Sequence, residues 1–124
     1  MATEQQVYDL SLQAAADFYT ASKQFYLMKL DTNGRAALAG AANAAMIGTL
    51  QNKPKQYEAA EVRQLGITKA ICGGNVTCGA KVTGDSDSKA VAATATQKYF
   101  GTAMETGADG RVISVLMEHG YMPA

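Results

Sequence analysis

Apolar and polar residues alternate in short runs along most of this chain, and clusters of glycine, asparagine and aspartate separate the runs. Alternation with a period of two is typical of β-strands that bury one face. Long stretches with helical periodicity are few. The pattern therefore predicts a mainly β protein, a small antiparallel β-barrel or sandwich with at most one or two short helices. The predicted strands cover residues 23–30, 46–50, 61–71, 98–105 and 111–117.

Three turn-forming segments separate the apolar runs. Residues 31–34 read DTNG, in which Asn33-Gly34 is a strong signal for a tight turn. Residues 84–88 consist almost wholly of turn formers, and residues 106–110 include Asp-Gly. We expect a turn at each of these places.

Pro54 and Gly66 restrict where the predicted strands can run. Pro54 is unsuited to an interior strand position, so residues 51–59 are predicted to form a loop. Gly66 lies at the centre of the strand predicted for 61–71, where glycine often marks a bulge or a sharp bend at the corner of a small barrel. A turn of helix is predicted around residues 41–45.

The N-terminal part of the chain carries two competing patterns. Residues 8–13, YDLSLQ, alternate as a strand would. A helical spacing is also present, and its apolar members are Val7, Leu10, Ala14, Ala15 and Phe18. The pattern alone leaves both interpretations open.

The amino-acid composition predicts a hydrophobic core with few large apolar side chains. Of the 124 residues 48% are hydrophobic, but alanine makes up much of this fraction, and there are three Phe and no Trp. Alanine contributes little transfer free energy, whereas a fully buried Leu, Ile or Phe contributes about 1.5–3 kcal/mol. A thin core of this kind predicts stabilisation by a partner or by other copies of the chain.

Charge and hydropathy restrict the partners. The net charge is zero and the basic residues are scattered, so no basic stripe indicates nucleic-acid binding. The first ten residues do not resemble a signal peptide, and no apolar run approaches the about 20 residues of a membrane helix. We expect a protein that is made in a cytoplasm and binds neither nucleic acid nor membrane.

Cys72 and Cys78 bracket a glycine-containing stretch. Their spacing fits neither a thioredoxin-like C-x-x-C nor a zinc site, and Ala80 stands where a phosphate-binding loop requires lysine. If residues 73–77 form a hairpin loop, the two Cα atoms face each other about 4.5–5.5 Å apart, within disulfide range. The pair is predicted to be two packed thiols in the cytosol, or a disulfide formed after release from the cell.

His119 is the single histidine. A catalytic base needs a nucleophile and an orienting group within reach, and no such motif accompanies it. Residues 85–88, DSDS, depart from the EF-hand pattern because Lys89 falls where an Asx is required. We therefore predict a surface or interface histidine, no catalytic residue, no metal site and no cofactor.

Three blocks of sequence, taken together, carry a family resemblance: AMIGTLQNKP (45–54), AAEVRQLGITKAICGGNVTCGAKVTGDSDSKAV (59–91) and YFGTAMETGADGRVISVLM (99–117). The chain resembles the small capsid decoration, or cement, proteins of tailed bacteriophages over about residues 24–118. It departs from the family pattern at the two cysteines, at Ala80 in place of aspartate, and at Ser88 in place of glycine.

The resemblance implies a structural virion protein that binds the exterior of the expanded capsid and stabilises it. Its implied partners are the major capsid protein and itself, as trimers at threefold or quasi-threefold positions. It would be made in the bacterial host cytoplasm and end on the outer capsid surface. A small β-barrel module that binds a ligand or carbohydrate is the alternative, and a hydrolase or transferase of unfamiliar type is a further one.

We also expect residues 1–22 to form an N-terminal arm and residues 23–124 to form the β-rich decoration domain. The arm would order on binding to the capsid or to a neighbouring subunit. Deleting residues 2–20 is predicted to abolish capsid binding and to leave a folded core. The proposed contact residues of the arm are Val7, Tyr8, Leu10, Phe18 and Tyr19.

Overall fold

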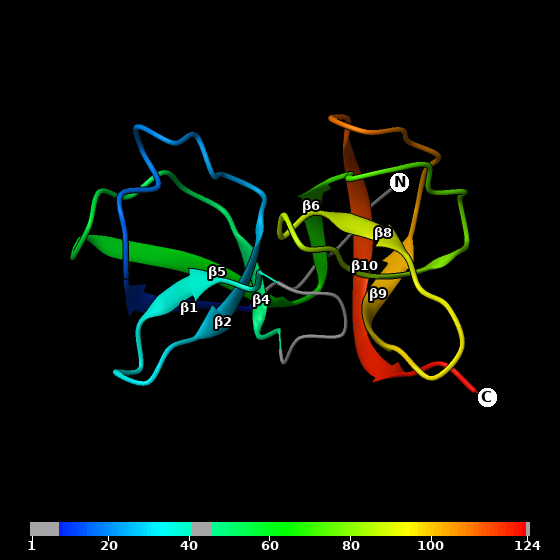
Figure 1. The fold of residues 1–124 in the computed structure, drawn as a ribbon, viewed down its shortest axis with the longest axis horizontal. Coiled ribbons are helices and arrows are strands. Elements are labelled where there is room, and N and C mark those ends of the chain that lie inside the picture. Colours follow the sequence, from blue (N-terminus) through cyan, green and yellow to red (C-terminus); the bar gives the residue numbers. More distant parts are fainter. Residues whose placement is uncertain (1–7, 41–45, 124) are drawn as a thin grey trace, which may run out of the picture.

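The computed structural model describes residues 8–40 and 46–123, which form ten β-strands and no helix (Figure 1). Two antiparallel five-stranded sheets lie side by side. The strands of the first sheet are β1 (Tyr8–Gln13), β2 (Leu27–Leu30), β3 (Ala36–Leu38), β4 (Gly48–Leu50) and β5 (Ala59–Leu65). The strands of the second are β6 (Ile67–Ile71), β7 (Lys81–Gly84), β8 (Ala90–Ala92), β9 (Lys98–Ala103) and β10 (Val112–Tyr121).

Each sheet is rolled up until its two edges meet. A bridge joins Ala14, directly after β1, to Ala36 at the start of β3. The equivalent bridge in the second sheet joins Cys72, directly after β6, to Ala90. Closing a sheet in this way removes its open edges. The predicted small antiparallel barrel is therefore present twice.

The two barrels are copies of one topology. The strand orders are β1-β5-β4-β2-β3 and β6-β10-β9-β7-β8, which are the same order shifted by five strands. Local sequence repeats with them: DTNGRA at 31–36 corresponds to DSDSKA at 85–90, and IGT at 47–49 corresponds to FGT at 100–102. The chain thus contains an internal repeat, which the alternation pattern had not revealed.

The β2–β3 and β7–β8 turns show how closely the copies agree. Oδ1 of Asp31 accepts hydrogen bonds from the backbone N–H groups two and four residues on, each at 2.9 Å. Oδ1 of Asp85 accepts the corresponding pair, also at 2.9 Å. Gly34 and Ser88 both have positive φ, 74° and 63°. The turn is retained although serine stands where the resembled family has glycine.

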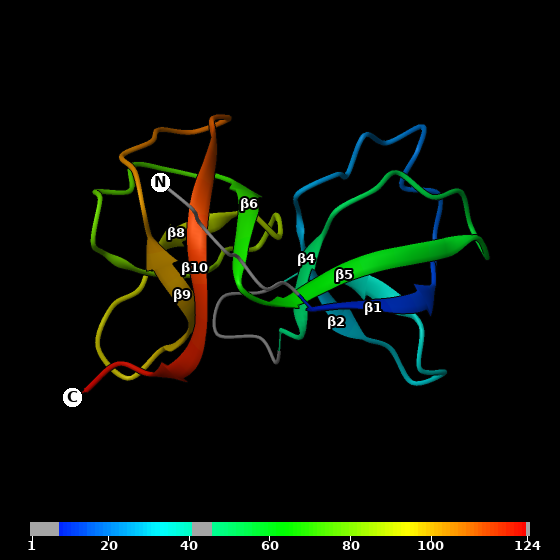
Figure 2. The ribbon, with the colours of Figure 1, turned by 180° about the vertical axis from the view of Figure 1, so that it is seen from behind.

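The barrels are joined at a sharp corner and share part of one core. Gly66, with φ of 92°, is the only residue between β5 and β6, so the bend predicted for this glycine is confirmed (Figure 2). Leu27 and Ala39 belong to the first barrel but are buried in the apolar cluster of the second. The backbone N–H of Leu27 donates to the carbonyl of Ser88 at 2.8 Å. These contacts fix one barrel against the other.

The structure also decides the open questions of the N-terminal part. Residues 8–13 are a strand, β1, so the alternating pattern and not the helical spacing is confirmed. β1 pairs with β5 throughout its length, and the two barrels meet at Gly66. The division into an arm of residues 1–22 and a decoration domain of residues 23–124 stays a prediction. The helical turn expected at 41–45 lies outside the described residues.

Candidate contact surface

In the part of the chain that the structure describes, the side chains that could bind a metal ion or take part in catalysis do not form a cluster. No group of three or more His, Cys, Asp or Glu side chains there is arranged to hold a metal ion. His119 lies on β10 and is exposed, and partial desolvation by the surrounding chain lowers its pKa below the usual value. Within the same residues, no helix is long and apolar enough to cross a membrane.

The two cysteines do not face each other. The hairpin expected at 73–77 is wrong, because β6 pairs with β10 and the chain reaches β7 only after a longer loop. Cys72 is a buried free thiol and Cys78 is an exposed one. Burial raises the pKa of the Cys72 thiol. Cys72 occupies the position in the second barrel that Ala14 occupies in the first. Since Ala14 is a small buried residue, this equivalence indicates that Cys72 is a small core residue too.

The proposed arm residues have different environments. Tyr8 and Tyr19 are exposed, Leu10 is half-buried in β1, and Phe18 is buried in the core of the first barrel. Val7 lies outside the described residues. A deletion of residues 2–20 therefore removes β1 and Phe18 from a barrel and does not simply trim a separate arm. Contact of these residues with a capsid stays a prediction.

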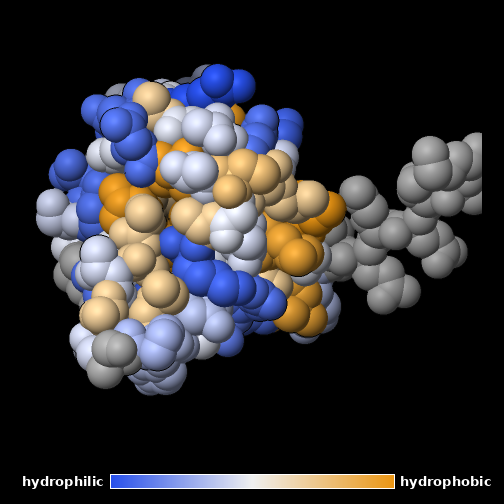
Figure 3. Space-filling model, turned by 90° about the vertical axis from the view of Figure 1, so that its right-hand side faces the viewer, coloured by the Kyte–Doolittle hydropathy of each residue, from blue (hydrophilic) through white to orange (hydrophobic). Residues whose placement is uncertain are grey.

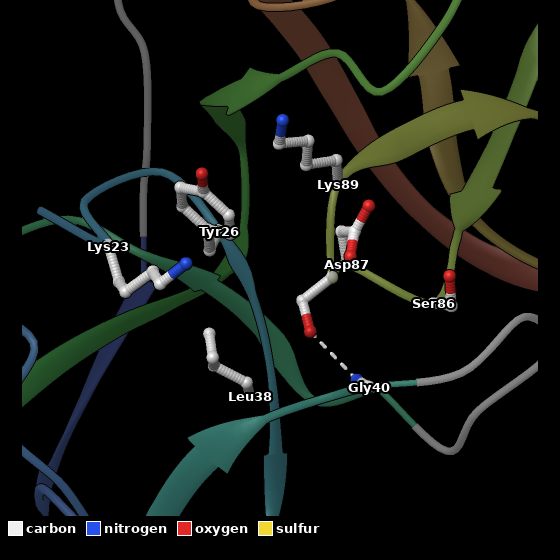
Figure 4. A pocket seen from close by; sticks show the side chains of 8 residues that line it. Lys23, Tyr26, Leu38, Gly40, Ser86, Asp87 and Lys89 are labelled. Atoms are coloured by element: carbon white, nitrogen blue, oxygen red, sulfur yellow. Dashed lines mark hydrogen bonds between the residues drawn. The ribbon is translucent and has the colours of Figure 1, made fainter. Parts of the chain in front are cut away.

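A hollow of about 400 Å³ lies where the β7–β8 turn meets the first barrel (Figure 4). Lys23 and Tyr26 lie on one side of it and Lys89 on the other, and the N–H of Gly40 donates to Oγ of Ser88 at 2.7 Å. Most of the lining side chains are charged or carry a hydroxyl. Small-molecule sites are usually lined mainly by apolar groups.

A second hollow, of about 570 Å³, is lined by residues of both barrels, among them Arg63 of β5 and Ile67 of β6. Nε of Arg63 donates to Oδ1 of Asp9 at 2.8 Å, and Nε2 of Gln51 donates to Oγ1 of Thr68 at 2.8 Å. Many of its polar groups therefore already bond one another. One aromatic side chain lines each hollow, Tyr26 the first and Phe25 the second, and polar side chains make up most of both linings.

Strand β10 carries apolar side chains on its outer face as well as on its inner face. Its inward-facing residues Ile113, Val115 and Met117 are buried. Its outward-facing residues Val112 and Leu116 are also apolar, and they are 38% and 44% exposed. The outer face of the strand thus carries exposed apolar side chains on either side of Ser114.

Neighbouring strands extend this exposed face. On β6, Ile71 pairs with Val112 and Ile67 pairs with Leu116. Met104, directly after β9, continues this face: its side chain is 46% exposed, and its backbone N–H donates to the carbonyl of Ser114 on β10 at 2.9 Å. We call these five residues of the second barrel the apolar strip: Ile67, Ile71, Met104, Val112 and Leu116.

Figure 3 views the molecule from the end of the second barrel and shows apolar side chains gathered at its surface, notably toward the right-hand edge. Exposed apolar side chains gathered on one face mark sites of contact with other proteins, and here Lys69 and Ser114 lie between two apolar pairs. The sequence held a signal for it, because RVISVLM at 111–117 is nearly continuously apolar and such a run predicts burial on both faces. That burial is not supplied within the described chain.

The fold places the protein in one structural class, that of two small closed β-barrels that follow each other along the chain. No family model matches the sequence, and no curated protein matches it. Among solved structures, the fold is similar to that of the N base of head fibre gp8.5 in bacteriophage phi29. The TM-score is 0.70 at 16% sequence identity, over 91% of this chain and 95% of that one. At this identity the likeness shows a shared fold.

Proposed function

We propose that this chain is a structural virion protein that binds the exterior of the expanded capsid of a tailed phage and stabilises it. The observation that carries the proposal is the apolar strip, an exposed adhesive surface on a fold shared with a protein of a phage head. The resemblance of the sequence to capsid decoration proteins supports the same conclusion. The exposed apolar strip, and not either of the two hollows, is what supports this proposal.

The physical basis of stabilisation is multivalency. A capsid offers many equivalent positions, so a modest free energy of binding at each position adds up over the shell. We propose that the protein occupies threefold or quasi-threefold positions as a trimer, with the major capsid protein and its own copies as partners. Synthesis in the host cytoplasm and a final place on the outer surface follow from this role.

Binding to undecorated capsids tests the proposal. Purified protein is mixed with expanded capsids that lack it, and the bound fraction is measured by sedimentation and the capsid melting temperature by calorimetry. We expect saturable, stoichiometric binding and a higher melting temperature of the particle. Unexpanded procapsids are the matched control and should bind less. No binding to expanded capsids, or binding without any change in their melting temperature, would contradict the proposal.

A further inference from the structure

The internal repeat allows the apolar strip to be compared with the same face of the first barrel. The cross-strand pair Ile67 and Leu116 on the second barrel corresponds to the pair Asp9 and Arg63 on the first. In the first barrel these two form an ion pair at 2.8 Å. The same fold therefore accepts a charged pair where the second barrel has two partly exposed apolar side chains.

Two further positions show the same contrast. Ile71 corresponds to Gln13, and Met104 corresponds to Gln51, each in the same place relative to its barrel. An apolar side chain that stays in water contributes little to folding, because the transfer free energy comes from area removed from water. The first barrel shows that the topology does not need an apolar outer face. The strip therefore has a role outside the barrel.

One cation lies at the centre of the strip. Lys69 pairs with Ser114, between the pair Ile71–Val112 and the pair Ile67–Leu116. Its ammonium lies 5.8 Å from the ring centroid of Phe25, and no ion pair joins it to a carboxylate in the part of the chain that the structure describes. A partner surface that covers the strip has to accommodate this charge.

The position of Lys69 argues against a twofold pairing of two strips. If two strips met face to face about a twofold axis through their centre, each Lys69 would meet its own copy. Like charges placed together in an interface oppose association. A different protein surface, with apolar side chains around a carboxylate, satisfies both the strip and its cation.

We propose that the apolar strip is the surface by which this protein sits on the capsid, and that the capsid patch it covers is apolar with an Asp or Glu opposite Lys69. This inference rests on the proposed function, since it names the contact that capsid binding uses. The apolar side chains supply the free energy of binding when they leave water. The ion pair fixes the orientation of the protein on the shell.

The internal repeat supplies the test variant. The double substitution Ile67→Asp/Leu116→Arg transfers the Asp9–Arg63 pair of the first barrel to the second, so the fold is expected to be kept. Circular dichroism and thermal melting check this. We expect the affinity of the variant for expanded capsids to fall roughly tenfold or more, because central apolar contacts are lost.

Two single substitutions accompany the double variant. Lys69→Glu reverses one exposed charge, carries little risk for folding, and is expected to weaken binding several-fold with a changed salt dependence. Leu30→Arg is the matched control, because Leu30 is 49% exposed on the first barrel and lies outside the strip. It should bind capsids as the unsubstituted protein does.

The outcomes separate this inference from the function on which it rests. If the unsubstituted protein binds capsids and both strip variants bind within about twofold of it, the strip is not the docking surface and the proposed function stands. If the unsubstituted protein does not bind, both proposals fail. If the strip variants change only self-association, measured by sedimentation velocity, the strip is a contact between copies and the inference is overturned.

Discussion

Gly48 and Gly101 occupy the same place in the two barrels, and each is pressed against a backbone carbonyl of the neighbouring strand. A Cβ atom on Gly48 would overlap the carbonyl oxygen of Arg63. A Cβ atom on Gly101 would overlap that of Leu116. Both contacts lie where β4 or β9 crosses its partner strand, so the close approach is a property of the repeated unit.

Substitution of either glycine by alanine is expected to destabilise the protein. Gly48→Ala and Gly101→Ala force a methyl group against backbone, which has no flexible way to yield, and we expect a loss of about 1–3 kcal/mol or more in the free energy of unfolding. Urea unfolding followed by circular dichroism measures it. Gly74→Ala is the control, because its nearest neighbour would be Cγ1 of Val91 at 3.8 Å. Equal stability of all three variants would contradict this account.

Leu27 is expected to couple the two barrels. It is fully buried in the core cluster of the second barrel, although it belongs to the first. Leu27→Ala should lower the free energy of unfolding by about 2–5 kcal/mol and make the two barrels unfold less cooperatively. Leu30→Ala, on the same strand but exposed, should have little effect. A single sharp transition of unchanged midpoint in the Leu27 variant would show that the shared core is not needed.

The two thiols are expected to differ strongly in reactivity. A water-soluble thiol reagent should modify Cys78 rapidly in the native protein and Cys72 only after unfolding, because access and thiolate character both control the rate.

The raised pKa of Cys72 also means that its contribution to stability is lost as the pH rises above the ordinary thiol value of 9.0.

Cys72→Ala tests this second effect. The variant should show a weaker loss of stability between neutral and alkaline pH than the unsubstituted protein. Its cost at neutral pH should be small, on the order of 1 kcal/mol, since one heavy atom is removed. Cys78→Ala is the matched control, because it removes the exposed thiol and keeps the buried one. Rapid modification of both thiols in the native protein would contradict the observed burial.

Asp31 is expected to make stability depend on acid pH. Hydrogen bonds to its carboxylate, that from the backbone N–H of Arg35 first among them, lower the pKa of Asp31 below its ordinary value of 3.8. A lowered pKa in the folded state means that the stabilisation is present above 3.8 and is lost as the pH falls through the lower value.

Asp31→Asn keeps an acceptor oxygen and removes the titration. Its free energy of unfolding should therefore depend less on pH in the acid range than that of the unsubstituted protein. Asn33→Ala changes the same turn and keeps the carboxylate, so its acid profile should match the unsubstituted one. Identical acid profiles for the Asp31 variant and the unsubstituted protein would rule out this contribution.

Several elements of the fold were predictable because local chemistry fixes them. Asn33-Gly34 and Asp109-Gly110 favour turns in any context, since glycine accepts a positive φ without steric cost. The structure has turns at both places, with φ of 74° and 84° at the two glycines. The short apolar run at 111–117 predicted a strand, and β10 covers it from Val112 onward.

Strand partners were not predictable from the same patterns. The stretch between Cys72 and Cys78 suggested a hairpin, but β6 pairs with β10, which follows it by some forty residues of chain. Pairing depends on which distant strands bury apolar surface together, and short-range turn signals do not carry that information. The burial of Phe18 and of Leu27 was decided in the same way, by contacts between segments far apart in the sequence.

The sequence by itself determined the strand character of the chain, the positions of its sharp turns and the bend at Gly66, because these follow from the side-chain period and from backbone sterics at single residues. The tertiary structure decided that the strands close into two equivalent barrels, that Cys72 is inside and Cys78 outside, and that one face of the second barrel stays apolar and uncovered. The reason is that closure and burial are set by long-range packing, which brings together residues that no local pattern relates.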